Sequence, residues 1–442
     1  MQYLQQILFV LVLAVASYLL FKRYNFIKKG INLGKPLDRT DRSSERWRSM
    51  FLVAFGQKKM FKKPLPAFLH LFVYAGFLII NLEVLEFIID GLAGSHRIFA
   101  PYLGGFYSVL MNFFEFLAVA VLTACVIFLI RRNIIKVERF HKPEMTKWPS
   151  LDANLILITE VVLMLAVLNM NAADQVLQAK GAAHYTATGS LFFSSFFMPL
   201  FQNLEIGTLI VFERAFWWFH IIGILGFAVY VTYSKHLHIF LAFPNTYYSN
   251  LNPMGKVANM DSVTNEVKLM LGMPVEGDAT APPAEVGRFG AKDVNDLSWK
   301  SLMDSFTCTE CGRCTAECPA NQTGKKLSPR AIMMATRDRV EEVLTDEKGL
   351  ENGKSLLNDF ITKEEINACT SCNACVEACP VLIDPLSIIL DLRRFISMEE
   401  SGSPAAWNSM FSNIETNFAP WKFAPTDRFN WADDLKNESV KE

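Results

Sequence analysis

The residues of this 442-residue chain that could carry chemistry are first of all its cysteines. Eight of the nine lie in two short motifs, "CTECGRCTAECP" at 308–319 and "CTSCNACVEACP" at 369–380, and both have the spacing C-x2-C-x2-C-x3-C-P. Thiols clustered in this way indicate metal or cluster ligands in a reducing compartment, and not a disulfide framework. Zinc is the alternative to iron–sulfur clusters, although structural zinc sites usually use paired C-x2-C knuckles.

The spacing is similar to that of the bacterial dicluster ferredoxins, in which the fourth cysteine of each motif binds the other cluster. This similarity implies two [4Fe–4S] clusters with crossed ligand sets. The first set comprises Cys308, Cys311, Cys314 and Cys379, and the second set comprises Cys369, Cys372, Cys375 and Cys318.

Histidines are the second candidate ligands, and four of the seven lie in apolar surroundings. His70 belongs to "PAFLHLFVYAGF", and the other three to "FWWFHIIGILGFAVYVTYSKHLHIF". On one continuous helix, His220 and His238 would share a face about 27 Å apart, whereas His236 would be rotated by about 160°. His70 and His238 would lie at a similar depth in the membrane, so they are expected to be the two axial ligands of a b-type haem. The alternative is that they are ordinary histidines at helix ends.

His220 lacks an obvious partner, because Ile80 stands where a second ligand could face it. A second haem is therefore left open. Glu83, Glu86 and Glu115 fall near the depth of His220. They would form a polar pocket that exchanges protons with a quinone, or they would be helix-end carboxylates that reach the membrane interface, an interpretation favoured for Glu86.

The elements that must position these residues are five apolar stretches, each long enough to span a membrane. They lie at about 3–21, 66–89, 105–130, 153–173 and 212–234. Loops 22–63 and 131–150 carry 13 and 6 Lys/Arg, whereas loops 91–104 and 174–208 carry one each. This asymmetry predicts that the N-terminus lies outside and the cysteine motifs lie in the cytoplasm. The expected location is a bacterial inner membrane. A cleaved signal peptide is the alternative for the first stretch, but basic residues follow it and none precedes it.

The expected organisation has four parts: a membrane domain at 1–243, a linker at 244–300, a ferredoxin-like domain at 301–400 and a C-terminal docking tail at 401–442. Cap residues followed by proline predict helix starts at Ser328-Pro329 and Asp384-Pro385, and Thr362 with Glu365 predicts a capping box. The fold class is an all-α membrane domain plus a mainly α-helical dicluster ferredoxin domain. The net charge of −1 gives no indication of a nucleic-acid partner.

The segments "FGAKDVNDLSWKSLMDSFTCTECGRC" and "YSKHLHIF" resemble a family of membrane-bound iron–sulfur oxidoreductases. These proteins fuse a nitrate-reductase-gamma-like cytochrome b to a heterodisulfide-reductase-C-like ferredoxin, and some are electron-transfer-flavoprotein:menaquinone oxidoreductases. The gamma-like part carries four haem-ligating histidines; His70, His220 and His238 match three of them, and Ile80 replaces the fourth. The resemblance thus implies haem b, with menaquinone as substrate.

Members of that family often continue into a domain with cysteine-rich CCG motifs, which this sequence does not contain. Its aromatic tail, with Trp407, Trp421 and Trp431, is predicted to dock a separate CCG-type subunit; the alternative is that the tail packs on its own ferredoxin domain.

The expected function is therefore electron transfer within a membrane-bound quinone oxidoreductase of a respiratory chain. Electrons would pass between menaquinone, haem b and two clusters, to or from a cytoplasmic CCG-type subunit or electron-transfer flavoprotein. The basic loop 22–63 is expected to contact the ferredoxin domain or an acidic partner. A cluster-bearing membrane sensor or transporter without quinone chemistry is the alternative; it predicts inverted repeats, and none is evident.

Overall fold

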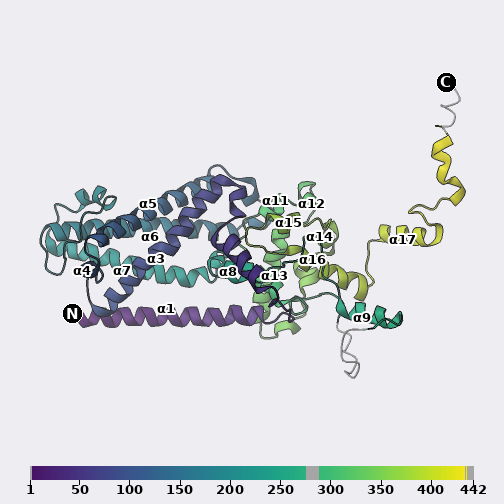
Figure 1. The fold of residues 1–442 in the computed structure, drawn as a ribbon, viewed down its shortest axis with the longest axis horizontal. Coiled ribbons are helices and arrows are strands. Elements are labelled where there is room, and N and C mark those ends of the chain that lie inside the picture. Colours follow the sequence, from purple (N-terminus) through teal and green to yellow (C-terminus); the bar gives the residue numbers. More distant parts are fainter. Residues whose placement is uncertain (1, 275–287, 434, 436–442) are drawn as a thin grey trace. The chain divides into compact units, whose positions relative to one another are not determined.

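The structure, a computed structural model, describes residues 2–274, 288–433 and 435, and these residues are mainly helical (Figure 1). Within them no β-strand forms, and backbone pairing of that kind is limited to two isolated bridges. The Gly/Pro-containing part of the expected linker, 275–287, lies outside the described residues. The all-α fold class expected from the sequence is confirmed.

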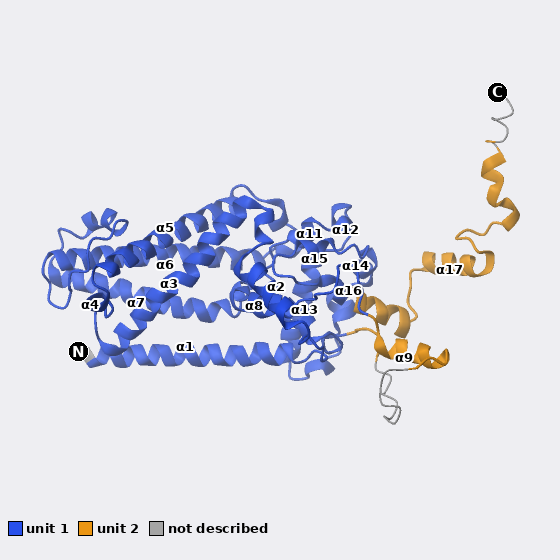
Figure 2. Ribbon diagram, viewed as in Figure 1, with its two compact units in different colours: residues 1–258, 293–388 blue, residues 259–292, 389–442 orange. Residues whose placement is uncertain are grey.

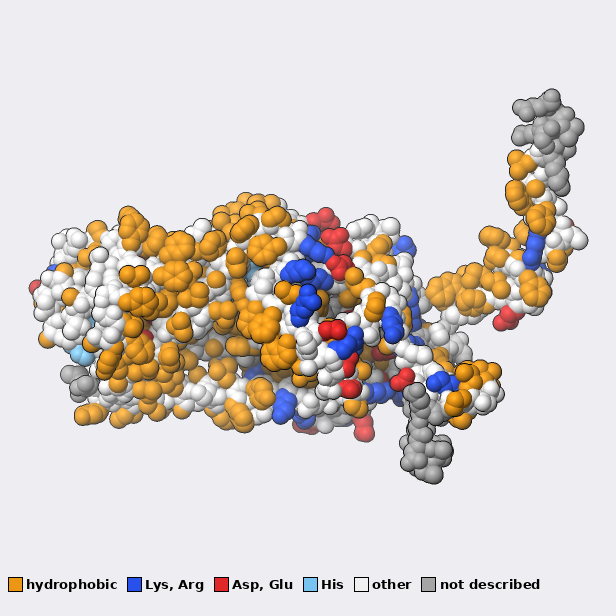
Figure 3. Space-filling view, viewed as in Figure 1, with side chains coloured by type: hydrophobic (Ala, Val, Ile, Leu, Met, Phe, Trp, Pro, Cys, Tyr) orange, Lys and Arg blue, Asp and Glu red, His pale blue; other side chains and the backbone are white. Residues whose placement is uncertain are grey.

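Five long helices correspond to the five apolar stretches. They are α1 (Gln2–Ile31), α3 (Pro64–Ala93), α5 (Gly105–Asn133), α6 (Trp148–Ala179) and α7 (Ile206–Val231). Each is long and apolar enough to cross a membrane. Apolar side chains cover these helices on the face shown in Figure 3, whereas charged side chains gather over the cysteine-motif part of the same unit. The number of candidate spans is therefore confirmed.

Close approaches between helices hold this bundle together. Gly76 of α3 lies against α5, where an added Cβ would stand 2.4 Å from a methyl group of Val121, so a larger residue would force the two helices or this side chain to move. At the other side of the bundle, the ring of Phe9 on α1 lies 5.5 Å from that of Trp217 on α7. Val121, Phe9 and Trp217 all belong to one buried apolar core.

The fifth span ends earlier than the sequence analysis expected. Helix α7 stops at Val231; Ser234 is extended, and its hydroxyl accepts a hydrogen bond from the His236 N–H at 3.0 Å. A short 3₁₀ turn and a separate helix, α8 (His238–Tyr247), follow. The prediction that His220 and His238 lie on one continuous helix was therefore wrong. The cause is a serine side chain that offers the backbone a competing hydrogen bond.

The cysteine motifs lie among short helices. These are α10 (Trp299–Thr307), α11 (Arg313–Ala316), α12 (Pro319–Gln322), α13 (Pro329–Thr345), α14 (Lys363–Ala368), α15 (Ala374–Ala378) and α16 (Pro385–Arg394). The predicted helix starts are confirmed, because Ser328 accepts from the N–H of Ala331 and Asp384 accepts from the N–H of Ser387 at 3.0 Å. The capping box of Thr362 is formed as well.

The chain divides into two compact units (Figure 2). Unit 1 comprises residues 1–258 and 293–388, and it contains the five long helices together with both cysteine motifs. It also contains the short helices α2 (Ser43–Met50) and α4 (Ala100–Leu103). Unit 2 comprises residues 259–292 and 389–442, with helices α9 (Asp261–Met270) and α17 (Ala405–Asn417).

Candidate electron-transfer site

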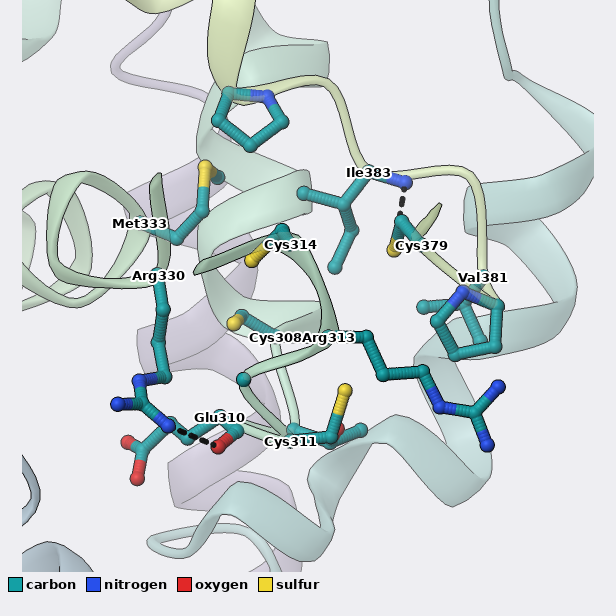
Figure 4. A pocket seen from close by; sticks show the side chains of 14 residues that line it. Cys308, Glu310, Cys311, Arg313, Cys314, Arg330, Met333, Cys379, Val381 and Ile383 are labelled. Atoms are coloured by element: carbon teal, nitrogen blue, oxygen red, sulfur yellow. Dashed lines mark hydrogen bonds between the residues drawn. The ribbon is translucent and has the colours of Figure 1, made fainter. Parts of the chain in front are cut away.

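The four cysteines of the first set line one cavity (Figure 4). Cys308 follows the last turn of α10, Cys314 lies on α11, Cys311 lies in the loop between these helices, and Cys379 follows α15. The N–H of Ile383 donates to Cys379 Sγ at 3.3 Å. Two segments more than sixty residues apart thus bring together the cysteines that the ferredoxin-like spacing implied.

The chemistry of this cavity fits a cluster better than a single ion. Among the described residues, no group of three His, Cys, Asp or Glu side chains closes around one metal ion, as a zinc site with bonds of about 2.3 Å would require. Burial raises the pKa of Cys308 and Cys379 to about 12. Such thiols become thiolates only when bound positive charge compensates for the lost solvation.

The second set is more open to solvent. Cys375 on α15 lies close enough to Cys369 and Cys318 for their charges to interact, and burial raises its pKa to about 12. Cys318 and Cys375 are buried, whereas Cys372 is exposed. The structure therefore groups three cysteines of the second set and leaves Cys372 at the surface of the same loop.

The loop of the first motif is fixed to the segment between α5 and α6. Gly312 has a φ of 72°, and a Cβ there would stand 2.4 Å from the Arg330 guanidinium, so the position requires glycine. Arg330 is fully buried; it donates to Glu144 Oε1 and to the carbonyl oxygen of Arg139, both at 2.7 Å. This arginine joins the cysteine loop to the membrane-helix region.

Three histidines meet at the end of the bundle that faces the cysteine motifs, called the module end. The ring centroids of His70 and His238 are 6.4 Å apart. His70 Nδ1 lies 2.9 Å from Gln57 Oε1, and His238 Nδ1 lies 3.2 Å from the carbonyl oxygen of Lys235. Because both oxygens are acceptors, each Nδ1 carries the proton, and each Nε2 is left as a metal-binding nitrogen.

The distance between the two rings is consistent with a shared metal. Imidazole bonds of about 2 Å to one ion would place two ring centroids roughly 6 Å apart. The observed 6.4 Å between His70 and His238 agrees with this value. His236 stands perpendicular to His238 and packs against Phe227 at 5.9 Å. The residues therefore fit a bis-histidine haem site, although His238 reaches it from α8 and not from the long span.

His220 has no such partner. It is buried, its Nδ1 lies 3.1 Å from the carbonyl oxygen of Leu163, and its ring packs edge-on against Phe87 at 5.8 Å. Ile80 lies in the surrounding apolar core with Phe87. Among the described residues, no second histidine ring contacts that of His220.

The opposite end of the bundle, called the distal end, holds a buried polar network centred on Arg97. Its guanidinium donates to Asn171 Oδ1 at 2.7 Å and to Asp174 Oδ2 at 3.1 Å, and it lies 3.8 Å from Glu83 Oε1. Sequence analysis missed Arg97 and Asp174, because Arg97 was counted only as a loop charge that indicates topology. The local signal was Arg97, a basic residue close in sequence to Glu83 and Glu86, whereas Asp174 is 77 residues away.

The predicted carboxylates at this end are all buried. Glu86 accepts hydrogen bonds from the Tyr107 hydroxyl at 2.7 Å and from a backbone N–H at 3.0 Å. Glu115 accepts from the N–H of Phe193 at 3.0 Å. The interpretation of Glu86 as a carboxylate that reaches the membrane interface was therefore wrong, because hydrogen-bond donors inside the bundle satisfy it.

These features define a class: a multi-helix, membrane-anchored iron–sulfur protein. Residues 304–383 match the family model described as a 4Fe-4S dicluster domain, so this part of the chain is an iron–sulfur domain. No solved structure matches the chain.

Full-length comparisons agree with that class. The chain is 28% identical to the probable iron-sulfur-binding oxidoreductase FadF of Bacillus subtilis, over 98% of this chain and 61% of that protein. It is 26% identical to the EtfAB:quinone oxidoreductase of Syntrophomonas wolfei, over 97% and 59%. A probable membrane-anchored ferredoxin of Chromohalobacter salexigens is 29% identical over 36% of this chain.

The chain spans about three fifths of the length of the first two relatives. The expected resemblance to iron–sulfur oxidoreductases is confirmed.

Proposed function

We propose that this chain passes electrons between menaquinone in the membrane and a redox partner in the cytoplasm, as the electron-transfer subunit of a quinone oxidoreductase. One observation carries the proposal. The carbonyl oxygen of Lys235 accepts from His238, and the ammonium group of the same residue donates to Glu310 at 2.5 Å, between Cys308 and Cys311. A single residue therefore contacts both the histidine pair and the first cysteine motif.

In this proposal His70 and His238 hold haem b, which supplies one-electron transfer within the membrane. The two cysteine sets hold the [4Fe–4S] clusters, with the fourth ligands crossed. Gln57 and Lys235 orient the two imidazoles through Nδ1 and keep each Nε2 available. His220 remains the candidate ligand for a second haem.

The distal end is the proposed place of quinone chemistry. Oxidation of a quinol releases two protons with its two electrons, so the site needs groups that accept protons. Glu83 Oε1 is buried without a hydrogen-bond partner, and Glu115 lies in the same network through Asn171. The relative from Syntrophomonas wolfei, named as a quinone oxidoreductase, supports the choice of substrate class.

The proposed orientation in the membrane rests on the basic loops. Arg23 pairs with Glu341 at 2.5 Å, and Lys62 pairs with Glu377, so the basic segment 22–63 contacts the ferredoxin region. A location of this face in the cytoplasm of a bacterial inner membrane is supported by the positive charge of that segment.

The tail in unit 2 is the proposed docking element for a CCG-type iron–sulfur subunit or an electron-transfer flavoprotein. Its aromatic side chains are exposed, for example Trp421 at 70% and Trp431 at 69%. Exposed aromatic residues are typical anchors of protein interfaces. Removal of residues 404–442 should spare every cofactor and abolish only electron transfer to the purified partner.

The test of the function uses a reduced menaquinone analogue and the purified full-length protein. In the wild type, the quinol should reduce both a b-type absorbance and the clusters. The His238→Ala variant should keep its clusters, seen by iron content, but the quinol should no longer reduce them. Cluster reduction at an undiminished rate in a haem-free variant would contradict the haem-mediated route. A wild-type protein with clusters but neither b-type absorbance nor reaction with quinol would favour the sensor or transporter alternative.

Crossing of the cluster ligands has its own test. Cys318→Ser should damage the cluster held by Cys369, Cys372 and Cys375, while the cluster of the first set remains. Electron paramagnetic resonance distinguishes the two signals, and a loss confined to the first set would contradict the crossed assignment.

A further inference from the structure

Glu310 is the centre of a buried ionic triad beside the first cysteine set. It stands between Cys308 and Cys311, is only 3% exposed, and has a left-handed backbone with a φ of 55°. Its carboxylate accepts from Lys235 Nζ at 2.5 Å and from Arg337 Nη2 at 2.7 Å. Lys235 comes from the turn after α7 and Arg337 from α13, so the triad joins the membrane-helix region to the ferredoxin region.

The partner of the other histidine makes a second link to the same motif. Gln57, which accepts from His70, is two residues from Lys59. The carbonyl oxygen of Lys59 accepts from Arg313 Nη1 at 3.5 Å, and Arg313 lies directly between Gly312 and Cys314. Both segments that orient the histidine pair are thus bound to the loop of the first cysteine set.

The second set differs from the first in the exposure of one ligand and in its links to the membrane-helix region. Its ligand Cys372 is exposed to solvent. Its neighbouring residues contact segment 22–63 through lysines that do not contact His70 or His238: Lys59 Nζ lies 3.4 Å from the carbonyl oxygen of Val376, and the exposed Lys62 pairs with Glu377. One cysteine set is therefore fixed toward the histidines, and the other presents a ligand to the aqueous phase.

We infer that the two cysteine sets act in a fixed order: electrons from the membrane enter at the first set and leave to the soluble partner from the second set, at Cys372. Lys235 and Glu310 are positioning residues that hold the first set against His238. The inference rests on the proposed function. Each quinol is oxidised to quinone and releases two electrons and two protons. The electrons pass one at a time through both cysteine sets and reduce a one-electron acceptor.

Because Lys235 and Glu310 form a buried ion pair, their contact would hold the first cysteine set in one position relative to His238. Removal of Lys235 leaves the carboxylate of Glu310 with one cation fewer in a buried place, which disfavours this docking geometry. An apolar contact would tolerate sliding of the two surfaces, whereas a buried ion pair with short hydrogen bonds does not.

The order can be measured without turnover, from spin relaxation of the two reduced clusters. Cys311→Ser and Cys372→Ser assign the two signals by the change that serine ligation causes. With the haem ferric, the signal of the first set should relax faster than that of the second. A dysprosium chelate added to the solution should do the reverse and act mainly on the second set.

Lys235 is tested in the same experiment. The Lys235→Met protein should lose the relaxation enhancement of the first set at unchanged iron and haem content. The Lys235→Arg protein should retain the enhancement. Lys326→Met is the matched control, because Lys326 forms an exposed ion pair with Glu364 at 2.6 Å within the ferredoxin region. It should behave as the wild type.

The outcomes separate this inference from the proposed function. Equal relaxation of both sets, or stronger enhancement of the second set by the haem, would overturn the order while quinol still reduces the protein. An enhancement that survives Lys235→Met would overturn the role of the ionic triad. Failure of quinol to reduce a protein that shows the expected relaxation would contradict only the proposed substrate, and absence of a b-type haem would overturn both.

Discussion

Histidine pairs occur at both ends of the helical bundle, and they differ in what surrounds their nitrogen atoms. At the module end, the rings of His70 and His238 are 6.4 Å apart; at the distal end, those of His96 and His184 are 6.0 Å apart. The first two use Nδ1 for neutral acceptors. His96 instead directs Nε2 at the carboxylate of Asp174, at 3.1 Å.

The comparison teaches that ring distance alone does not identify a metal site. The Nε2 of His96 already binds a carboxylate, so this nitrogen is not available to a haem iron. Its neighbour His184 is exposed in a loop. In the proposed function, the module end therefore serves electron transfer, and the distal end, with its buried carboxylates around Arg97, handles protons.

The largest expected effect separates the two histidine pairs. His70→Ala and His238→Ala should each abolish the b-type absorbance, because each would remove a ligand of the proposed haem. His96→Ala and His236→Ala are the controls and should retain it. Visible spectra of the dithionite-reduced proteins give the answer, and bleaching by His96→Ala would reverse the comparison.

Arg97→Met should have the next largest effect, on stability. It leaves Asp174 and its neighbours as buried carboxylates without their counter-ion, a loss of about 3–5 kcal/mol. Unfolding in detergent, followed by circular dichroism, measures it. Arg97→Lys should recover only part of the loss, because an ammonium group cannot replace the several contacts of the guanidinium. A fully stable Arg97→Met protein would show that the network contributes no stability.

Gln57→Leu should weaken haem binding without abolishing it. Loss of the Nδ1 acceptor of His70 removes the group that fixes the ring, and such changes reduce metal affinity by about 10–100-fold. Haem titration of the apoprotein is the measurement. Gln175→Leu, at the distal end, alters an amide whose Nε2 is buried without a partner and should not change the affinity.

The smallest effect is expected for a solvated ion pair. Lys142 and Glu138 lie four residues apart at 2.8 Å, and the carboxylate is largely exposed. Lys142→Met should change the free energy of unfolding by roughly 0.5 kcal/mol or less. A change of the size expected for Arg97→Met would show that burial is not what distinguishes the two.

The sequence was sufficient to predict those features that depend on residues close together in the chain. The apolar stretches, the cysteine spacing and the capping box of Thr362 are patterns within a few residues, and the structure contains the corresponding helices. The break before His238 was missed because a single capping serine, Ser234, competes with an otherwise apolar helix pattern. The distal network was missed because Arg97 and Asp174 are 77 residues apart, and only folding brings them together.

The short helix α8 connects His238 to the loop that follows Cys379. It is ten residues long, about 15 Å at 1.5 Å per residue, with His238 at its first position. Near its other end, Asn245 Nδ2 donates at 3.0 Å to the carbonyl oxygen of Val381, two residues after Cys379. In the proposed function, a cysteine loop that has not received its iron would leave this helix without its anchor. Maturation would then be ordered: cells starved of iron–sulfur clusters would accumulate protein that also holds haem poorly.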